Sequence, residues 1–155
     1  MSGVTVSEGG ILDLDAIMEV MDASFDPAFG EAWTAPQCAG LMPMPGVSLS
    51  IARDGEEVIG FALGRVVIRE AELLLLAVKP DRRCRGTGQL LVNRFTLLAT
   101  TRGAEQLHLE VREGNHAVKL YLNLGFAEVG RRKNYYRGRD GQVYDALTLA
   151  RKIGA

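Results

Sequence analysis

The chain has 155 residues, 47% of them hydrophobic and 24% charged, and its formal net charge is −1 at pH 7. This length suits one domain with a substantial core, and we expect a single domain over residues 1–155. The near-zero net charge argues against nucleic-acid binding through a general positive field, and no apolar run reaches the ~20 residues needed to cross a bilayer.

The first part of the chain predicts three strands and two helices. Apolar residues alternate with polar ones in the strands and recur at helical spacing in the first helix. A proline in its first turn marks the second helix, and Asp54-Gly55 is typical of a hairpin turn. In chain order we expect a strand at residues 4–6, a helix at 11–25, a short helix starting at 34–36, and strands at 47–51 and 57–67.

The second part of the chain predicts four more strands and two more helices. In chain order we expect a strand at 73–78 buried on both faces, a helix at 86–102, a strand at 107–111, a short helix at 115–124, and paired strands at 126–132 and 143–150. The helix at 86–102 is a crossover, so the strands that it joins should run parallel. The predicted fold class is α/β in the broad sense (α+β): a mixed, mostly antiparallel sheet of about seven strands flanked by about four helices.

The segment from Leu73 to Leu91 gives the strongest functional signal. An apolar strand leads into a basic turn and then into Gly86-x-Gly88 at the start of a helix. This order brings main-chain N–H groups, arginine charge and the positive end of a helix dipole together, which favours a phosphate or pyrophosphate. A Rossmann fingerprint would need glycine in place of Leu91, and a P-loop would need lysine in place of Gln89. The alternative is that the glycines only shape a turn and the arginines are solvated.

Several ordered motifs resemble the GNAT superfamily of N-acetyltransferases. Arg83-x-x-Gly86-x-Gly88 after an apolar strand is similar to its acetyl-CoA motif. Two further motifs follow: Leu109-Glu110-Val111 with Asn115, and Leu120-Tyr121-x-x-Leu124-Gly125-Phe126. The resemblance covers residues 47–149. Arg131-Arg132-Lys133-Asn134-Tyr135-Tyr136, followed by Asp145-Ala146, resembles the RimI-type group of this superfamily, which acetylates the N-terminal alanine of a small-subunit ribosomal protein.

The resemblance implies the GNAT fold, acetyl-CoA as cosubstrate, no metal, and direct attack of an amine on the thioester. It implies Glu110 as the general base and Tyr121 as the general acid. One strand would pair with the pantetheine through its backbone, and the following turn would hold the pyrophosphate. The implied cofactor-binding residues are Leu76, Ala77 and Val78 in the strand, Arg83, Cys84, Arg85, Gly86, Thr87, Gly88 and Gln89 in the turn, and Asn115 further along the chain.

The residues around each motif affect the roles that the resemblance implies. Alternation in its strand places Glu110 on the face opposite Leu109, towards a cleft or towards solvent. Tyr121, on its short helix, is an acid or a core aromatic. Cys84 stands where the family usually has arginine or another polar residue, which removes one phosphate contact. Asn115 is one residue closer to Tyr121 than usual, and because one residue turns a helix by about 100°, its cofactor contact is in question.

Three groups of residues are candidates for the acceptor side. Trp33, Tyr135 and Tyr136 could line an acceptor groove, although Trp33 suits the core equally well. A run of carboxylates could attract a basic peptide or form a solvated helix face: Asp13, Asp15, Glu19, Asp22, Asp26 and Glu31. A basic run could meet the ribose phosphate of the cofactor or form a charged hairpin: Arg131, Arg132, Lys133, Arg137 and Arg139.

We expect an acetyl-CoA-dependent N-acetyltransferase that modifies an N-terminal α-amino group. The pKa of that amine is about 7.7–8.0, against about 10.4 for lysine, so more of it is unprotonated in the cell. The alternatives are a polyamine, an aminoglycoside or lysine as acceptor, or acyl-CoA binding without turnover.

The cellular setting follows from weaker signals. The start of the chain lacks the pattern of a secretory signal, and Cys38 and Cys84 have neither metal-site nor disulfide spacing. We therefore expect a cytoplasmic monomer or weak dimer. Its partners would be acetyl-CoA and a protein N-terminus, without metal, membrane or direct nucleic-acid contact.

Overall fold

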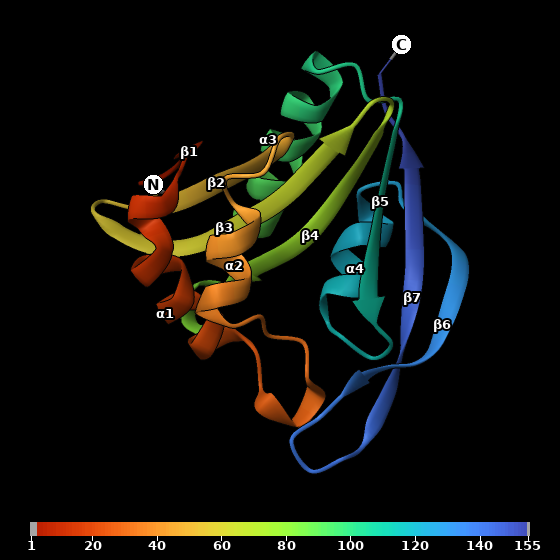
Figure 1. Ribbon diagram of the computed structural model, residues 1–155. Coiled ribbons are helices and arrows are strands. Elements are labelled where there is room, and N and C mark those ends of the chain that lie inside the picture. The colour runs from red at the N-terminus through yellow and green to blue at the C-terminus, as the bar shows by residue number, and fades with distance from the viewer. Residues whose placement is uncertain (1–2, 155) are drawn as a thin grey trace.

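A computed structural model describes residues 3–154 and shows a seven-stranded sheet with helices packed against it (Figure 1). Single turns of 3-10 helix lie in three connections: η1 (Ile11–Asp13), η2 (Pro27–Phe29) and η3 (Pro80–Arg82). The helices are α1 (Leu14–Ser24), α2 (Ala35–Leu41), α3 (Thr87–Thr101) and α4 (Ala117–Asn123). The strands are β1 (Val4–Glu8), β2 (Val47–Asp54), β3 (Glu57–Val67), β4 (Glu70–Val78), β5 (Gln106–Arg112), β6 (Ala127–Arg137) and β7 (Val143–Lys152).

The strands follow the order β1-β2-β3-β4-β5-β7-β6 across the sheet. Neighbours are antiparallel except for β4 and β5, which run parallel. A parallel pair needs a crossover connection, and helix α3 supplies it. The mostly antiparallel sheet, the four helices and the α3 crossover confirm the predicted fold.

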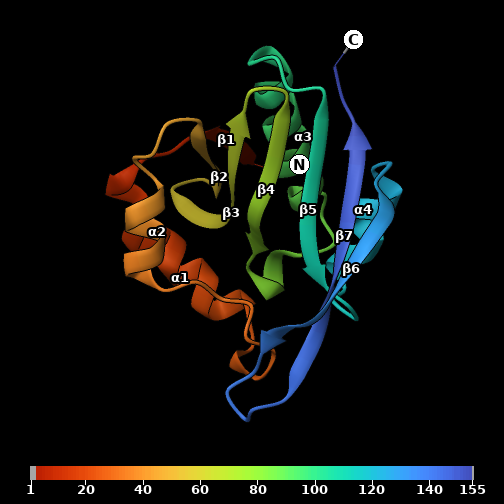
Figure 2. The ribbon, with the colours of Figure 1, turned by 45° about the vertical axis from the view of Figure 1, so that its right-hand side comes forward.

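Strands β4 and β5 diverge along their length (Figure 2). Their parallel pairing ends at Leu73 and Leu109. On the other edge of β4, Leu73 and Leu75 pair with consecutive residues of β3, so Leu74 is an extra residue and forms a β-bulge. A bulge bends and twists its strand, which turns the end of β4 away from β5. Alternate main-chain N–H and C=O groups of that end therefore face an opening in the sheet.

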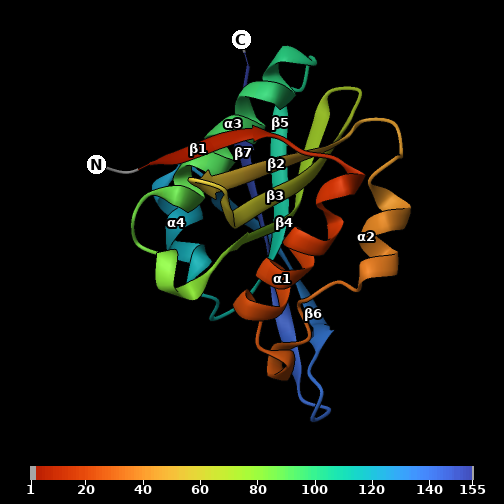
Figure 3. The ribbon, with the colours of Figure 1, turned by 90° about the vertical axis from the view of Figure 1, so that its left-hand side faces the viewer.

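Two helical layers cover the sheet (Figure 3). Helices α3 and α4 pack on one face through a core that includes Phe95 and Tyr121. Helix α1 packs on the other face, where Ile17 and Met21 meet Phe61 of β3. The opening between β4 and β5 thus lies between two layers, and residues from both can reach it.

Several boundaries differ from the predictions. The residues predicted to form one helix at 11–25 form η1 followed by α1. Helix α4 begins at Ala117, so Asn115 lies before it. Strand β4 is not buried on both faces, because Leu74 and Leu76 are only half-buried and line a pocket. Strand β6 extends beyond residue 132, since register shifts let its pairing resume past the charged run. Strand β7 extends beyond residue 150, because Arg151 and Lys152 pair with β5. None of the helices within residues 3–154 is both long and apolar enough to cross a membrane.

Candidate active site

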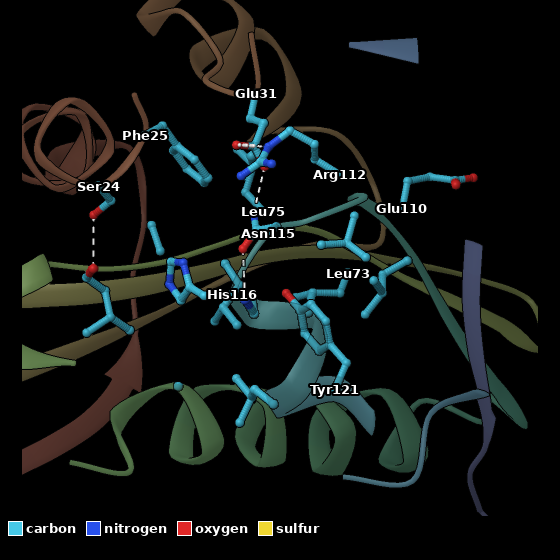
Figure 4. A pocket seen from close by; sticks show the side chains of 18 of the residues that line it. Ser24, Phe25, Glu31, Leu73, Leu75, Glu110, Arg112, Asn115, His116 and Tyr121 are labelled. Atoms are coloured by element: carbon cyan, nitrogen blue, oxygen red, sulfur yellow. Dashed lines mark hydrogen bonds and ion pairs between the residues drawn. The ribbon is translucent and has the colours of Figure 1, made fainter. Parts of the chain in front are cut away.

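The main pocket, of about 700 Å³, lies where β4 and β5 diverge (Figure 4). Pockets that bury small ligands fall in the range of about 300–1,000 Å³. The walls come from the end of β4, the end of β5, the starts of α3 and α4, the segment 24–33, and two tyrosines of β6. Glu110 and Tyr121 line the pocket, as do all the predicted cofactor-binding residues except Arg85, which is exposed.

The start of α3 forms an anion cradle. Gly86 precedes the helix with φ of 83°, a left-handed conformation that favours glycine. It offers no side chain to the first N–H groups of the helix, which are left for another acceptor. A Cβ on Gly86 would meet no atom within 4 Å, so the space around it is open. This geometry fits a phosphate or pyrophosphate group.

The second glycine of the motif has a packing role as well. A Cβ on Gly88 would come within 3.0 Å of Cδ2 of Leu120, so glycine here lets α3 lie close to α4. Cys84, the departure from the family pattern, is exposed and has φ of 62°. It therefore shapes the turn through its main chain.

Arg83 fastens the turn to the rest of the fold. Its Nε donates to the carbonyl oxygen of Val78 over 3.1 Å, and its Nη2 donates to the carbonyl oxygen of Ser24 over 3.1 Å. The Ser24 hydroxyl also donates to the carbonyl of Val78. Two donors of Arg83 are thus used within the protein, and they hold the ends of α1 and β4 beside the cradle.

The carboxylate of Glu110 is held by donors from two strands. Its side chain is 13% exposed, and Oε1 accepts from Nε of Arg132 over 3.0 Å. Oε2 accepts from the hydroxyl of Thr148 over 2.7 Å. In Figure 4 the carboxylate is turned away from Tyr121. Each oxygen retains a further lone pair for an amine or a water molecule.

Two tyrosine hydroxyls border the pocket. Tyr121 is buried, its ring lies edge-on to Phe126 at 5.7 Å, and its hydroxyl points into the pocket in Figure 4. Tyr136 is half-buried and donates to the carbonyl oxygen of Glu110 over 3.4 Å. Burial raises the pKa of both phenols well above its ordinary value. Both are therefore protonated near neutral pH and can serve as hydrogen-bond donors.

The side chain of Asn115 is used within the protein. Its Nδ2 donates to Oε2 of Glu31 over 2.7 Å, and its Oδ1 accepts from the N–H of Ala117 over 2.8 Å. Asn115 thus caps the first turn of α4 instead of lying within it, so the expected helical rotation does not apply. Its side chain lines the pocket with both polar groups already bonded.

The predicted acceptor aromatics also line the pocket. Trp33 also packs against the core cluster that includes α1, and its contact with an acceptor stays a prediction. Tyr135 is 51% exposed, and its ring lies edge-on to Tyr136 at 5.0 Å. Together they form a partly apolar part of the pocket rim.

Most of the predicted charged surfaces lie outside the pocket. Asp26 and Glu31 line it, whereas the carboxylates of η1 and α1 do not, and Asp13 and Glu19 form ion pairs elsewhere. The basic run of β6 also lies outside, and Arg131 there bonds to two carboxylates. The geometry favours a solvated helix face and a charged hairpin for these two runs.

Three polar residues of the pocket carry contacts that the sequence did not reveal. Glu31 pairs with Arg112, 81 residues away, at 3.0 Å. His116 lies beside them, and its pKa is lowered by burial and by the charges of Arg83 and Arg112, against an opposing effect of Glu31. The only signal in the sequence was that Arg112 and His116 adjoin residues of the motifs. Within residues 3–154, no group of three or more His, Cys, Asp or Glu side chains is placed to hold a metal ion.

Known proteins share this architecture. Residues 14–126 match the family model described as the acetyltransferase (GNAT) family. The [ribosomal protein bS18]-alanine N-acetyltransferase of Haemophilus influenzae is 38% identical over 97 residues, which are 63% of this chain and 66% of that enzyme. The enzyme of the same name from Salmonella typhimurium is 39% identical over 108 residues, 69% of this chain and 72% of that enzyme.

A solved structure extends the likeness to the whole fold. The crystal structure of the ribosomal-protein-S18-alanine N-acetyltransferase from Escherichia coli superimposes with a TM-score of 0.87 and 31% identity. The match covers 98% of this chain and 95% of that one. The anion cradle beside the diverging strands β4 and β5 is thus part of an acetyltransferase fold. The chain belongs to the acetyltransferase (GNAT) family, whose members take the acetyl group from acetyl-CoA.

Proposed function

We propose that this enzyme acetylates the α-amino group of a protein N-terminus, that of an N-terminal alanine in a small-subunit ribosomal protein. The observation that carries the proposal is the pocket, in which an anion cradle, a carboxylate and a buried phenol lie around the opening between β4 and β5. The bacterial relatives are named for that same acceptor, and the structural match to one of them spans nearly the whole chain.

The residues present fit acetyl-CoA, which would supply a thioester for an amine to attack. The N–H groups from Gly86 to Gln89 would bind its pyrophosphate at the positive end of α3. The free edge of β4 at Leu76, Ala77 and Val78 would pair with the amides of its pantetheine arm. Cys84 would contribute main chain, and Asn115 could contribute the second N–H of its amide, since only one N–H and one lone pair of that amide are used within the protein.

Two side chains of the pocket can accept and donate the protons that move in the reaction. The amine nitrogen forms a bond to the acetyl carbon while the carbon–sulfur bond breaks. Glu110 would take the proton that the amine loses, directly or through water, and the Tyr121 hydroxyl would donate to the departing sulfur. Because burial raises the pKa of Tyr121, its contribution lies in hydrogen bonding at least as much as in proton transfer.

The acceptor would arrive from the rim formed by Trp33, Tyr135 and Tyr136. Asp26 also lines the pocket, and its negative charge suits an N-terminal ammonium and basic residues after it, whereas the charge of Glu31 is paired with Arg112. All these groups come from one chain, so a monomer would suffice. A reaction on a ribosomal protein would take place in the cytoplasm.

A competition between acceptors tests the proposal. The enzyme is given acetyl-CoA with a peptide that begins with alanine, the same peptide blocked at its N-terminus but carrying lysine, and spermidine. We expect kcat/KM for the free alanine peptide to exceed both others by at least ~10-fold, since its amine is the most easily deprotonated of the three. Faster acetylation of spermidine or of the lysine would overturn the proposal.

A further inference from the structure

Glu31 reaches the pocket from the segment between η2 and α2 (Figure 4). Its side chain is only 9% exposed. Close packing against the β6–β7 hairpin fixes this segment: Gly30 has φ of 70°, and a Cβ there would collide with the carbonyl oxygen of Arg137. The N–H of Arg139 also donates to the carbonyl of Pro27 over 3.1 Å. The main chain thus holds Glu31 in one place.

The carboxylate of Glu31 connects this segment to the start of α4. Oε1 accepts from Nε of Arg112 over 3.0 Å, and Oε2 accepts from Nδ2 of Asn115 over 2.7 Å. Asn115 in turn accepts from the N–H of Ala117 in the first turn of α4. The guanidinium carbon of Arg112 lies 3.7 Å from the ring centroid of Phe29, which is a cation–π contact. Both sides of the pocket are therefore tied together through one carboxylate.

Helix α4 is short, and it carries Tyr121. The helix spans Ala117–Asn123, so capping of its first turn matters for the whole element. Burial is the main cause that raises the pKa of Tyr121, and the nearby Tyr136 and the charge of Glu31 raise it further. Glu31 from the η2–α2 segment and Tyr136 from β6 are thus the titratable groups that act on this hydroxyl.

We propose that Glu31 is a positioning residue for acetyl transfer, which places the Tyr121 hydroxyl by fixing the start of α4 through Asn115. This inference rests on the proposed function of the pocket and adds to it a residue that does not itself touch the reacting atoms. In this arrangement Asn115 is a relay from Glu31 to α4.

The variant Glu31→Met keeps the length of the side chain but removes its charge and both acceptor oxygens, so Asn115 loses its partner. We expect kcat to fall by about 10–100-fold, because small displacements of a catalytic group have effects of this size. KM for acetyl-CoA should change by less than ~3-fold, since the anion cradle of α3 is separate.

The matched control is Glu113→Met. Glu113 is a carboxylate on the β5–α4 connection, which also carries Asn115. It is half exposed, pairs with Arg131 and does not line the pocket. This control changes the net charge equally, so its kcat and its KM for acetyl-CoA should match those of the wild type.

A second variant separates positioning from stability. Glu31→Met alone leaves the buried Arg112 without its partner, which destabilises a protein. The double variant Glu31→Met/Arg112→Met removes both charges and should recover the melting temperature. We expect its kcat to remain at least ~10-fold low, because Asn115 still lacks the oxygen of Glu31.

The outcomes are distinct. If kcat recovers together with stability in the double variant, or if Glu31→Met keeps the wild-type kcat, the inference is overturned. Failure of the proposed function would show separately, as a wild-type preference for spermidine or lysine. In that case the same variants are measured with the preferred acceptor, and the inference is judged by kcat and the melting temperature.

Discussion

The hydroxyl of Thr148 donates to Oε2 of Glu110 over 2.7 Å, which joins the centres of two neighbouring strands. The two residues are directly opposite each other in the antiparallel pairing of β5 and β7. Arg132 of β6 binds the other oxygen of the same carboxylate. The proposed base is therefore oriented by the sheet itself, and not by a mobile loop.

Replacing this carboxylate should stop the reaction without preventing cofactor binding. We expect Glu110→Gln to lower kcat by about 10²–10⁴-fold, the usual contribution of a general base. Calorimetry should find the acetyl-CoA affinity nearly unchanged, because the cradle lies on α3. A variant that turns over normally, or that loses only cofactor binding, would assign Glu110 another role.

Thr148→Val tests the orientation of the same group. Valine keeps the volume and removes the hydroxyl, so Glu110 loses one of its two donors, and kcat should fall by about 10-fold. Thr100→Val is the matched control, since the Thr100 hydroxyl bonds only to the carbonyl of Thr96 among the described contacts and lies outside the pocket. Equal rates for the two variants would show that Thr148 does not orient the base.

The first glycine of the cradle can be tested against a glycine of the same conformation. Gly86 and Gly141 have φ of 83° and 87°, and a Cβ on either would meet no atom within 4 Å. Alanine at either position should cost about 1–2 kcal/mol of backbone strain. Only Gly86→Ala should weaken acetyl-CoA binding, by about 10-fold or more, since Gly141 lies in the β6–β7 turn. Equal affinities in a titration would place the phosphates elsewhere.

Tyr121→Phe should lower kcat by about 10–100-fold while the protein stays folded, because only the hydroxyl that faces the pocket is removed. Tyr144→Phe provides the comparison, since the Tyr144 hydroxyl bonds to Gln142 in the hairpin. Circular dichroism should show the wild-type melting temperature within a few degrees for both variants. A fully active Tyr121→Phe enzyme would return this residue to a purely structural role.

His116 should make the free enzyme less stable in mild acid. Its pKa in the folded protein is lowered from the ordinary 6.5, chiefly by burial, so the unfolded chain binds the proton first as the pH falls. The free energy of unfolding should therefore decrease as the pH falls through about 6.5 towards the folded pKa. His116→Gln should remove this part of the loss between about pH 7.5 and 5.5, as measured by urea denaturation. An unchanged pH dependence in the variant would contradict the assignment.

The sequence predicts what local patterns and motifs encode. The crossover α3, the hairpin at Asp54-Gly55 and the Gly86-x-Gly88 turn depend on residues close together in the chain, and all lie where expected. The bulge at Leu74 could not be predicted, because it arises from the pairing register between β3 and β4.

Long-range contacts account for the other differences. Glu31 is one of several carboxylates in its region, and only the fold brings it to Asn115, 84 residues away. Likewise, Gly88 meets Leu120 only when α3 and α4 pack together. Strand β6 extends to Arg137 through a charged segment with no clear alternation, because β7 supplies a partner beyond the bulges.

The most direct test of the account is a crystal structure with bound CoA. We predict that the pyrophosphate oxygens accept from main-chain N–H groups between Gly86 and Gln89, that the pantetheine lies along the free edge of β4, and that the sulfur lies within hydrogen-bond distance of the Tyr121 hydroxyl. Density for CoA at another site, or no binding at millimolar concentration, would contradict the account.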